Sequence, residues 1–128
     1  MNVEEAMSED SERRYLLLLP APEEEWAKLP DSELEIGMQN HQRFHEALAA
    51  RGHRLVMGSP LEPSELAVSM RNTGRGSALV TDGPFTEAAE QMVGFYLIDS
   101  RDEADLLEVV RSFAEGGDHV ELRRLATE

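Results

Sequence analysis

The sequence contains no cysteine, which excludes disulfide bonds, thiolate catalysis and every metal or iron–sulfur site built from cysteine. It also has no apolar run near the roughly 20 residues that cross a bilayer. The longest run, Tyr15 to Leu19, has the length of a strand. The first residues are acidic rather than basic and apolar, so we expect no secretory signal, no membrane association and a cytoplasmic location.

Basic residues are scarce as well. The chain has 12 Lys and Arg against 26 Asp and Glu, which gives a formal net charge of -14. Its bases form only isolated pairs, Arg13-Arg14 and Arg123-Arg124, so the chain would repel nucleic-acid phosphate. We therefore expect no direct nucleic-acid binding, and a surface charge that serves solubility.

The length of 128 residues and the 41% hydrophobic content fit one globular domain. Residues 1–12 are acidic with little apolar content, and are expected to form a flexible tail. The folded domain is expected to span residues 13–128.

The spacing of apolar residues predicts alternating strands and helices. We expect, in order, a strand at 15–19, a helix between Ser32 and Gly52, a strand at 53–57, a loop at 58–63, a hairpin of strands 66–71 and 78–81, one or two helical turns at 86–92, a strand at 94–99, a helix between Ser100 and Gly116, and a strand at 120–125.

Two capping boxes, Ser32 with Glu35 and Ser100 with Glu103, are expected to begin the two main helices. The first helix should bury one apolar stripe. That stripe comprises Leu34, Met38, His41, His45 and Leu48, with Phe44 beside it.

This order of elements predicts an α+β fold, a ferredoxin-like split βαβ sheet with two main helices on one face. The other face of the sheet would then be uncovered. Yet the run from Tyr15 to Leu19 is apolar at successive positions, which favours cover on both faces. A second copy packing sheet against sheet would supply that cover, so a homodimer is expected.

The central segment carries a recognisable motif. Thr81-Asp82-Gly83-Pro84-Phe85-Thr86-Glu87, then Glu90-Gln91, then Gly94-Phe95-Tyr96-Leu97-Ile98, resembles the hallmark of the YCII-related proteins with a DGPF motif. Tyr15 to Leu19, the helix end from Phe44 to Gly52, and Leu61-x-Pro63 also resemble the family pattern.

The resemblance covers roughly Arg13 to Leu125 and implies a dimeric α+β barrel of ferredoxin-like units. Two positions depart from the family pattern. Ala89 stands where the family commonly has lysine, and Val93 stands where it commonly has a second glycine. A mechanism that needs that lysine would not operate in this chain.

Asp82 follows a predicted strand and lies close in sequence to the aromatic ring of Phe85. A carboxylate against a ring in a partly dry cleft has a raised pKa, which suits a general acid or base. Aspartate before Gly-Pro is equally common as a turn residue that bonds backbone N–H groups, and both roles stay open. We expect a small-ligand cleft beside Asp82. Its candidate binding residues are Phe85, His45, Arg71 and Glu87.

His41 and His45 lie four residues apart on one helix face, a spacing that can chelate a metal. Gln42 replaces the glutamate that marks a zinc-protease helix, so we expect no metal and no cofactor; histidines bonded at the edge of the core are the simpler interpretation. Relatives in the wider superfamily imply a His–Asp pair. His41 is the candidate partner of Asp82, because its helix is expected to pack across the sheet that ends at Asp82. His53, at the start of a strand, is expected to be solvated.

Two functions remain open at this point. The first is a small-ligand-binding protein in which Asp82 and His41 perform acid–base chemistry, since the resemblance includes dehydrochlorinase-like lyases. The second is a non-catalytic regulatory or interaction dimer, since the resemblance also implies an association with extracytoplasmic-function sigma factors.

Overall fold

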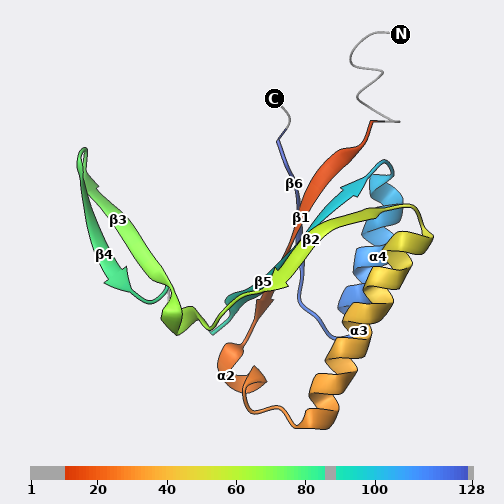
Figure 1. Ribbon diagram of the computed structural model, residues 1–128, viewed down its shortest axis with the longest axis horizontal. Helices are drawn as coiled ribbons and strands as arrows, with labels where there is room; N and C mark the ends of the chain where they lie inside the picture. The colour runs from red at the N-terminus through yellow and green to blue at the C-terminus, as the bar shows by residue number, and fades with distance from the viewer. Residues whose placement is uncertain (1–10, 86–88, 127–128) are drawn as a thin grey trace.

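A computed structural model describes residues 11–85 and 89–126 of the chain. The described part contains six strands, two long helices and two short helical turns (Figure 1). In chain order they are β1 (Arg13–Ala21), α2 (Glu23–Trp26), α3 (Asp31–Ala50), β2 (Arg54–Pro60), the 3-10 turn η1 (Ser64–Leu66), β3 (Val68–Gly74), β4 (Ser77–Asp82), β5 (Gln91–Ser100), α4 (Glu103–Glu115) and β6 (Glu121–Arg124).

Four of the strands form one antiparallel sheet in the order β2-β5-β1-β6. With α3 following β1 and α4 following β5, this is the strand order of a ferredoxin-like unit. Both long helices lie on the same face of the sheet (Figure 1). The predicted α+β, ferredoxin-like fold is therefore confirmed. We call this part, residues 11–60 and 91–126, the sheet unit.

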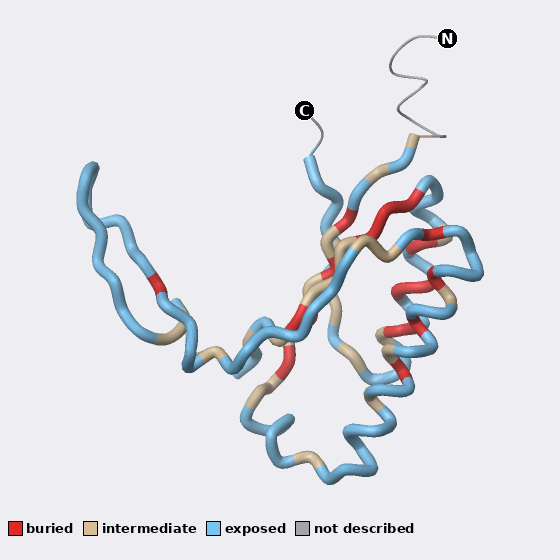
Figure 2. The backbone as a smooth tube through the Cα atoms, in the orientation of Figure 1, coloured by how far each residue is buried: buried red, intermediate tan, exposed pale blue. Residues whose placement is uncertain are grey.

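The core fills the space between the sheet and the two helices, where the buried segments gather (Figure 2). Burial alternates along β1, because successive side chains of a strand point to opposite faces. The core cluster consists of Tyr15, Leu17, Leu19, Phe44, Leu48, Ile98, Leu106, Val109, Val110 and Phe113. Leu16 and Leu18 face the other way and are only half-buried. One chain thus covers its first strand on one face.

The hairpin β3–β4 forms a separate two-stranded sheet, which we call the arm (residues 68–82). It lies on the side of the four-stranded sheet opposite to the helices and extends away from it (Figure 1). The connections at its base are tied to the sheet unit. The amide of Leu61 donates to the Val93 carbonyl at 2.8 Å, and the amide of Ser64 donates to the Glu23 carboxylate at 2.9 Å.

The predicted capping boxes are wrong at both helices. Helix α3 begins at Asp31, so Ser32 lies inside the first turn, and the N-cap residue Pro30 has no side-chain acceptor with which to cap it. Helix α4 is capped by Asp102, whose carboxylate accepts from the amide of Asp105 at 3.1 Å. Ser100 ends β5 instead.

The buried stripe of α3 also differs from the predicted one. Asn40, Phe44 and Leu48 are buried, whereas Met38 is 72% exposed and Leu34 is exposed. Figure 2 shows the first turns of α3 almost entirely exposed. Periodicity found the helix, but the extent of the sheet beneath it decides which turns are covered.

Two segments take a structure other than the predicted one. The expected loop at 58–63 begins as strand, because β2 continues to Pro60 at the edge of the sheet, where proline is tolerated. The expected helical turns at 86–92 end in strand, because Gln91 and Met92 pair with Ala21 and Pro20. Residues 86–88 lie outside the described part.

Candidate functional site

The side chain of Tyr96 lies on the helix-covered face of β5, beneath α3. Its hydroxyl is 2.7 Å from Nδ1 of His41 and 2.8 Å from Nε2 of His45. The ring of Tyr96 also packs edge-on against His45, with ring centroids 5.0 Å apart. One strand residue thus joins the two histidines that α3 presents four positions apart.

A carboxylate completes the group on the far side of His41. Oδ1 of Asp118, in the loop after α4, lies 3.2 Å from Nε2 of His41. Oδ2 of Asp118 accepts from the amide of Asn40 at 2.7 Å, and Asn40 also donates to the Phe113 carbonyl at 2.9 Å. The Asn40 side chain is buried, so Asp118 is held from inside the core. We call Asn40, His41, His45, Tyr96 and Asp118 the Tyr96 cluster.

Hydrogen-bond capacity fixes a direction along this cluster when both histidines are neutral. A carboxylate only accepts, so Nε2 of His41 carries the hydrogen toward Asp118, and Nδ1 of His41 accepts. The Tyr96 hydroxyl therefore donates to His41 and accepts from Nε2–H of His45. Nδ1 of His45 is then left with a lone pair at the exposed end.

The surroundings favour neutral groups at the exposed end of the cluster. Desolvation lowers the pKa of His45, and repulsion from His41 when that ring is protonated lowers it as well. Burial raises the pKa of Tyr96, and so does the charge of Asp118. His45 is therefore an unprotonated imidazole at neutral pH, and Tyr96 keeps its hydroxyl hydrogen.

Two glycines make room for the cluster. A Cβ at Gly58 of β2 would lie 2.2 Å from the Tyr96 ring, and a Cβ at Gly116 would lie 2.0 Å from Oδ1 of Asn40. Both distances are far below van der Waals contact. The absence of a side chain at these two positions is what allows Tyr96 and Asn40 to lie where they do.

The candidate residues of the sequence divide between two places. His41 and His45 belong to the Tyr96 cluster, at the edge of the core. Arg71, Asp82 and Phe85 lie in the arm or directly after it. There the guanidinium carbon of Arg71 stands 5.3 Å from the centroid of the Phe85 ring, a cation–π contact. Glu87 lies outside the described residues.

His41 was paired with Asp82 because its helix was expected to pack across the sheet that ends at Asp82, and that expectation is wrong. Asp82 ends β4, which belongs to the arm and not to the sheet that α3 covers. Arm and helix lie on opposite sides of that sheet (Figure 1), and the carboxylate beside His41 is Asp118. Asp82 also lines neither of the two hollows described below. A catalytic or binding role for Asp82 stays a prediction.

Sequence reasoning missed Tyr96, Asp118 and Asn40. One signal was present for Tyr96, a hydroxyl in the middle of an otherwise apolar strand opposite a helix with two histidines. Nothing comparable marks Asp118, because it stands 77 positions from His41 and reaches it only through the packing of α4 on α3.

His53 was expected to be solvated and is buried instead. Its Nδ1 is 2.8 Å from the Ser100 hydroxyl, and its Nε2 is 2.7 Å from Oδ2 of Asp105. The Arg51 guanidinium and the His53 imidazole lower the pKa of Asp105 to about 2. Ser100 is 2% exposed, and these contacts hold α4 against the end of the sheet.

Two hollows lie on the described surface. One, of about 420 Å³, lies between α3 and α4 and reaches Asn40 at the inner end of the Tyr96 cluster. The other, of about 190 Å³, lies where β1 begins and β6 ends. Among the described residues, no three His, Asp or Glu side chains are placed to hold a metal ion. Within the same part of the chain, no helix is long and apolar enough to span a membrane.

Comparison with known proteins identifies the family to which this architecture belongs. The YCII-related domain family matches residues 14–124, nearly the whole of the sheet unit and all of the arm. The chain belongs to the YCII-related family. An uncharacterized protein of Rhizobium meliloti (strain 1021), R00369, is 36% identical over 81 residues, which cover 62% of this chain and 61% of that protein. The resemblance of the Asp82-Gly83-Pro84-Phe85 segment and its surroundings is thereby confirmed at the level of the family.

Proposed function

We propose that this YCII-related protein binds a small organic ligand beside His45 and removes a proton from it. The observation that supports this is the continuous, directional chain of hydrogen bonds from the exposed imidazole of His45 to the carboxylate of Asp118. The neutral imidazole of His45 can take up a proton at the surface, and the carboxylate of Asp118 can stabilise the positive charge that results. This arrangement suits general base catalysis.

The proton movements balance along the chain. Nδ1 of His45 takes the proton of the ligand, and its Nε2–H passes to the Tyr96 oxygen. The hydroxyl hydrogen of Tyr96 passes to Nδ1 of His41, which becomes an imidazolium. That charge lies 3.2 Å from Asp118 rather than at the ligand. Return of the protons in the reverse order makes the same group a general acid.

Deuterium uptake tests this function without a known substrate. The probe is the exchange of carbon-bound hydrogen in small enolisable ketones in heavy water, followed by proton NMR. Wild type should accelerate exchange, and His45→Gln should lose that acceleration. Tyr96→Phe should lower it by about 10²-fold or more, the usual contribution of a positioned acid or base. His119→Gln is the matched control, because His119 is exposed, lies outside the Tyr96 cluster and approaches Glu90 at 3.6 Å.

A nitrogen NMR titration of the histidines reports on the same chain independently of any ligand. His45 should titrate below its ordinary pKa in wild type, and Tyr96→Phe should change its tautomer distribution. Unchanged acceleration of exchange in His45→Gln would contradict the proposed function. An unchanged titration and tautomer distribution of His45 in Tyr96→Phe would contradict it as well.

We also propose a homodimer, which is the basis of the alternative function as an interaction protein. The sheet face opposite the helices carries partly exposed apolar residues along β1 and β5, with Glu121 and Arg123 of β6 beside them. Leu16 pairs with Leu97 there, and Leu18 pairs with Phe95. All four are only half-buried, and the neighbouring Met57 is 51% exposed. Apolar patches of this kind mark interfaces.

The surface area of the chain supports the same conclusion. The chain exposes 9395 Å², whereas a folded monomer of 14.3 kDa exposes about 6,800 Å². Even if every residue outside the described part is counted as fully exposed, an excess of about 800 Å² is left. That is about the area which one partner buries in a standard interface.

Light scattering at micromolar concentration tests the dimer. Leu97→Lys on the face opposite the helices should convert dimer to monomer, since a lysine there would be buried without a partner. Leu107→Lys is the control, because Leu107 is 49% exposed on α4, a helix of the opposite face. A monomeric wild type, or a dimer untouched by Leu97→Lys, would remove the proposed interface.

A further inference from the structure

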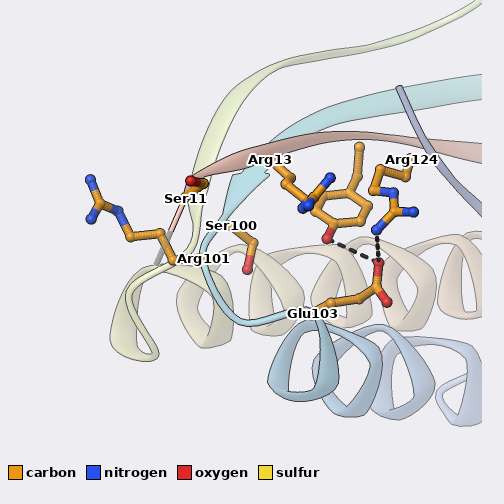
Figure 3. A pocket seen from close by; sticks show the side chains of 7 residues that line it. Ser11, Arg13, Ser100, Arg101, Glu103 and Arg124 are labelled. Atoms are coloured by element: carbon orange, nitrogen blue, oxygen red, sulfur yellow. Dashed lines mark hydrogen bonds and ion pairs between the residues drawn. The ribbon is translucent and has the colours of Figure 1, made fainter. Parts of the chain in front are cut away.

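The two hollows of the described surface differ in whether their polar groups have partners. In the smaller one, beside the start of β1, the Tyr15 hydroxyl donates to Glu103 at 3.0 Å, and Arg124 lies 3.7 Å from the same carboxylate (Figure 3). Figure 3 also shows the side chain of Arg101 directed away from this hollow. The larger hollow, of about 420 Å³ between α3 and α4, contains an acceptor without a partner, and we call it the inter-helix hollow.

The acceptor is Oδ1 of Asn40, a side chain that is only 4% exposed. Nδ2 of Asn40 donates to the Phe113 carbonyl and to Asp118, and because both of these groups accept, the bonds themselves tell the nitrogen of this amide from its oxygen. No donor of a described residue reaches Oδ1. Every wholly buried polar side-chain atom in the described part has a partner, so Oδ1 opens onto the hollow that Asn40 lines.

Gly116 keeps this oxygen accessible. It lines the same hollow, and a Cβ at this position would lie 2.0 Å from Oδ1 of Asn40. A nearly buried acceptor is unfavourable without a donor, so Oδ1 takes a hydrogen bond from water or from a ligand in the hollow. The rest of the lining distinguishes between these two donors.

The floor of the inter-helix hollow is apolar. Phe44 of α3 and Phe113 of α4 stack there, with ring centroids 4.3 Å apart and planes at 13°. Ala47 and Val109 complete the apolar lining. An apolar floor with few polar groups is typical of small-molecule sites, and 420 Å³ lies within their usual range of roughly 300–1,000 Å³. The hollow therefore suits a ligand with an apolar body and a hydrogen-bond donor.

The two helices place opposite charges at the rim of the hollow. Arg43 of α3 is exposed and makes no ion pair with a described residue. Glu115 is the last residue of α4, and its contact with Arg111 at 3.4 Å is an exposed pair, which contributes little. The end of a helix carries partial negative charge, and the last turn of α4 has no basic residue to balance it. The α4 side therefore favours a cation and the α3 side an anion.

We propose that the inter-helix hollow binds an apolar amino acid, which regulates the proton transfer proposed for His45. The ammonium group of the amino acid donates to Oδ1 of Asn40 and faces Glu115, and its carboxylate pairs with Arg43. Its side chain covers the stacked rings of Phe44 and Phe113. The Tyr96 cluster shares only Asn40 with this hollow, so the amino acid is an effector and not the substrate.

The regulation acts through Asn40, and it rests on the proposed function. When Oδ1 accepts from an ammonium group, Nδ2–H becomes a stronger donor, because hydrogen bonds in a chain polarise one another. Nδ2–H then withdraws charge from Asp118, whose other oxygen pairs with His41. Asp118 stabilises a protonated His41 less, so the bound amino acid slows proton removal at His45.

Titration of the full-length protein with L-leucine, followed by amide NMR, tests the site itself. Saturable shifts are expected in α3 and α4, including the side-chain amide of Asn40. Two analogues each lack one charged group, 4-methylpentanoate the ammonium and 3-methylbutylamine the carboxylate. Each should bind at least about tenfold more weakly, because one charge-assisted hydrogen bond is lost. Absence of saturable leucine shifts, or an analogue that binds as tightly as leucine, would overturn the site.

Substitutions at the rim assign the two ends of the ligand. Arg43→Gln should weaken leucine binding about tenfold and leave the affinity for 3-methylbutylamine within about twofold of wild type. Glu115→Gln should weaken the amine and leave 4-methylpentanoate unchanged. Arg75→Gln is the matched control, because Arg75 is an exposed arginine of the arm that makes no ion pair with a described residue. Equal weakening by Arg43→Gln and Arg75→Gln would mean charge screening without a site.

The regulation is measured in the deuterium exchange assay. Saturating leucine should slow exchange by wild type about fivefold or more, the lower end of the usual coupling between two sites. Leucine should also change the nitrogen chemical shifts of His41, which are read without any substrate. Unchanged His41 shifts at saturating leucine would overturn the regulation. Wild type without exchange activity would contradict the proposed function alone, since the leucine titration and the His41 shifts do not depend on it.

Discussion

The sheet unit and the arm differ in how far apart in the sequence their polar contacts reach. In the sheet unit, polar side chains meet across long stretches of sequence, as His41 meets Asp118 and His53 meets Asp105. In the arm, the contacts are local. Ser69 donates to the Gly83 carbonyl, and Thr73 bonds Ser77. Long-range polar networks are therefore a property of the sheet unit, within the described residues.

The exposure of apolar residues separates the two regions again. Val68, Met70 and Val80 share one face of the arm and are each more than half exposed. A two-stranded hairpin is marginally stable alone, and an exposed apolar face favours association. Arg71 and Arg75 also make the arm basic within an acidic chain. The family hallmark at Asp82 thus stands at the base of an exposed apolar hairpin, and the Tyr96 cluster lies elsewhere in the molecule.

The largest effect is expected at a glycine that the sheet unit requires. Gly58→Ala should lower the free energy of unfolding by about 1–3 kcal/mol, because its Cβ would collide with the Tyr96 ring. Urea denaturation measures this.

Gly37→Ala is the comparison, since Gly37 in α3 has nothing within 4 Å of an added Cβ. It should raise stability by up to about 1 kcal/mol through helix propensity. Equal effects of the two substitutions would show that Tyr96 is not held against β2.

A smaller, pH-dependent effect is expected at Asp105. Its folded pKa of about 2 lies below the ordinary 3.8, so its ionised form stabilises the fold. That contribution is complete above about pH 4 and is lost as the pH falls toward 2. The free energies of unfolding of wild type and Asp105→Asn, measured by denaturation between pH 6 and pH 2, should therefore differ at pH 6 and become equal near pH 2. A difference that stays constant over this range would contradict the assignment.

The smallest effect is expected at Asp82, in the arm. The residue is exposed, so Asp82→Asn should change the free energy of unfolding by no more than about 0.5 kcal/mol. Unfolding and light scattering are measured together. A loss above 1 kcal/mol would make Asp82 a structural turn residue, whereas unchanged stability with a weaker dimer would assign the motif to association.

Much of the fold could be predicted, because each strand and helix carries its own periodicity. The alternation along β3, the apolar run of β1 and the glycine stop after α3 are local signals, and Gly52 has the positive φ of 83° that such a stop requires. The predicted starts of both helices were wrong, because several neighbouring residues in each segment can occupy the N-cap position. The predicted buried stripe of α3 was wrong because the sheet does not extend beneath the first turns of this helix.

The candidate site divides in the same way. The sequence by itself determined that His41 and His45 share one helix face, since 3.6 residues per turn bring positions four apart together. It also determined the family, the acidic charge and the hairpin with its motif. Only the tertiary structure decided that Asp118, and not Asp82, lies beside His41. A carboxylate becomes a partner through the packing of distant elements, and strand spacing contains no information about which sheet a strand will join.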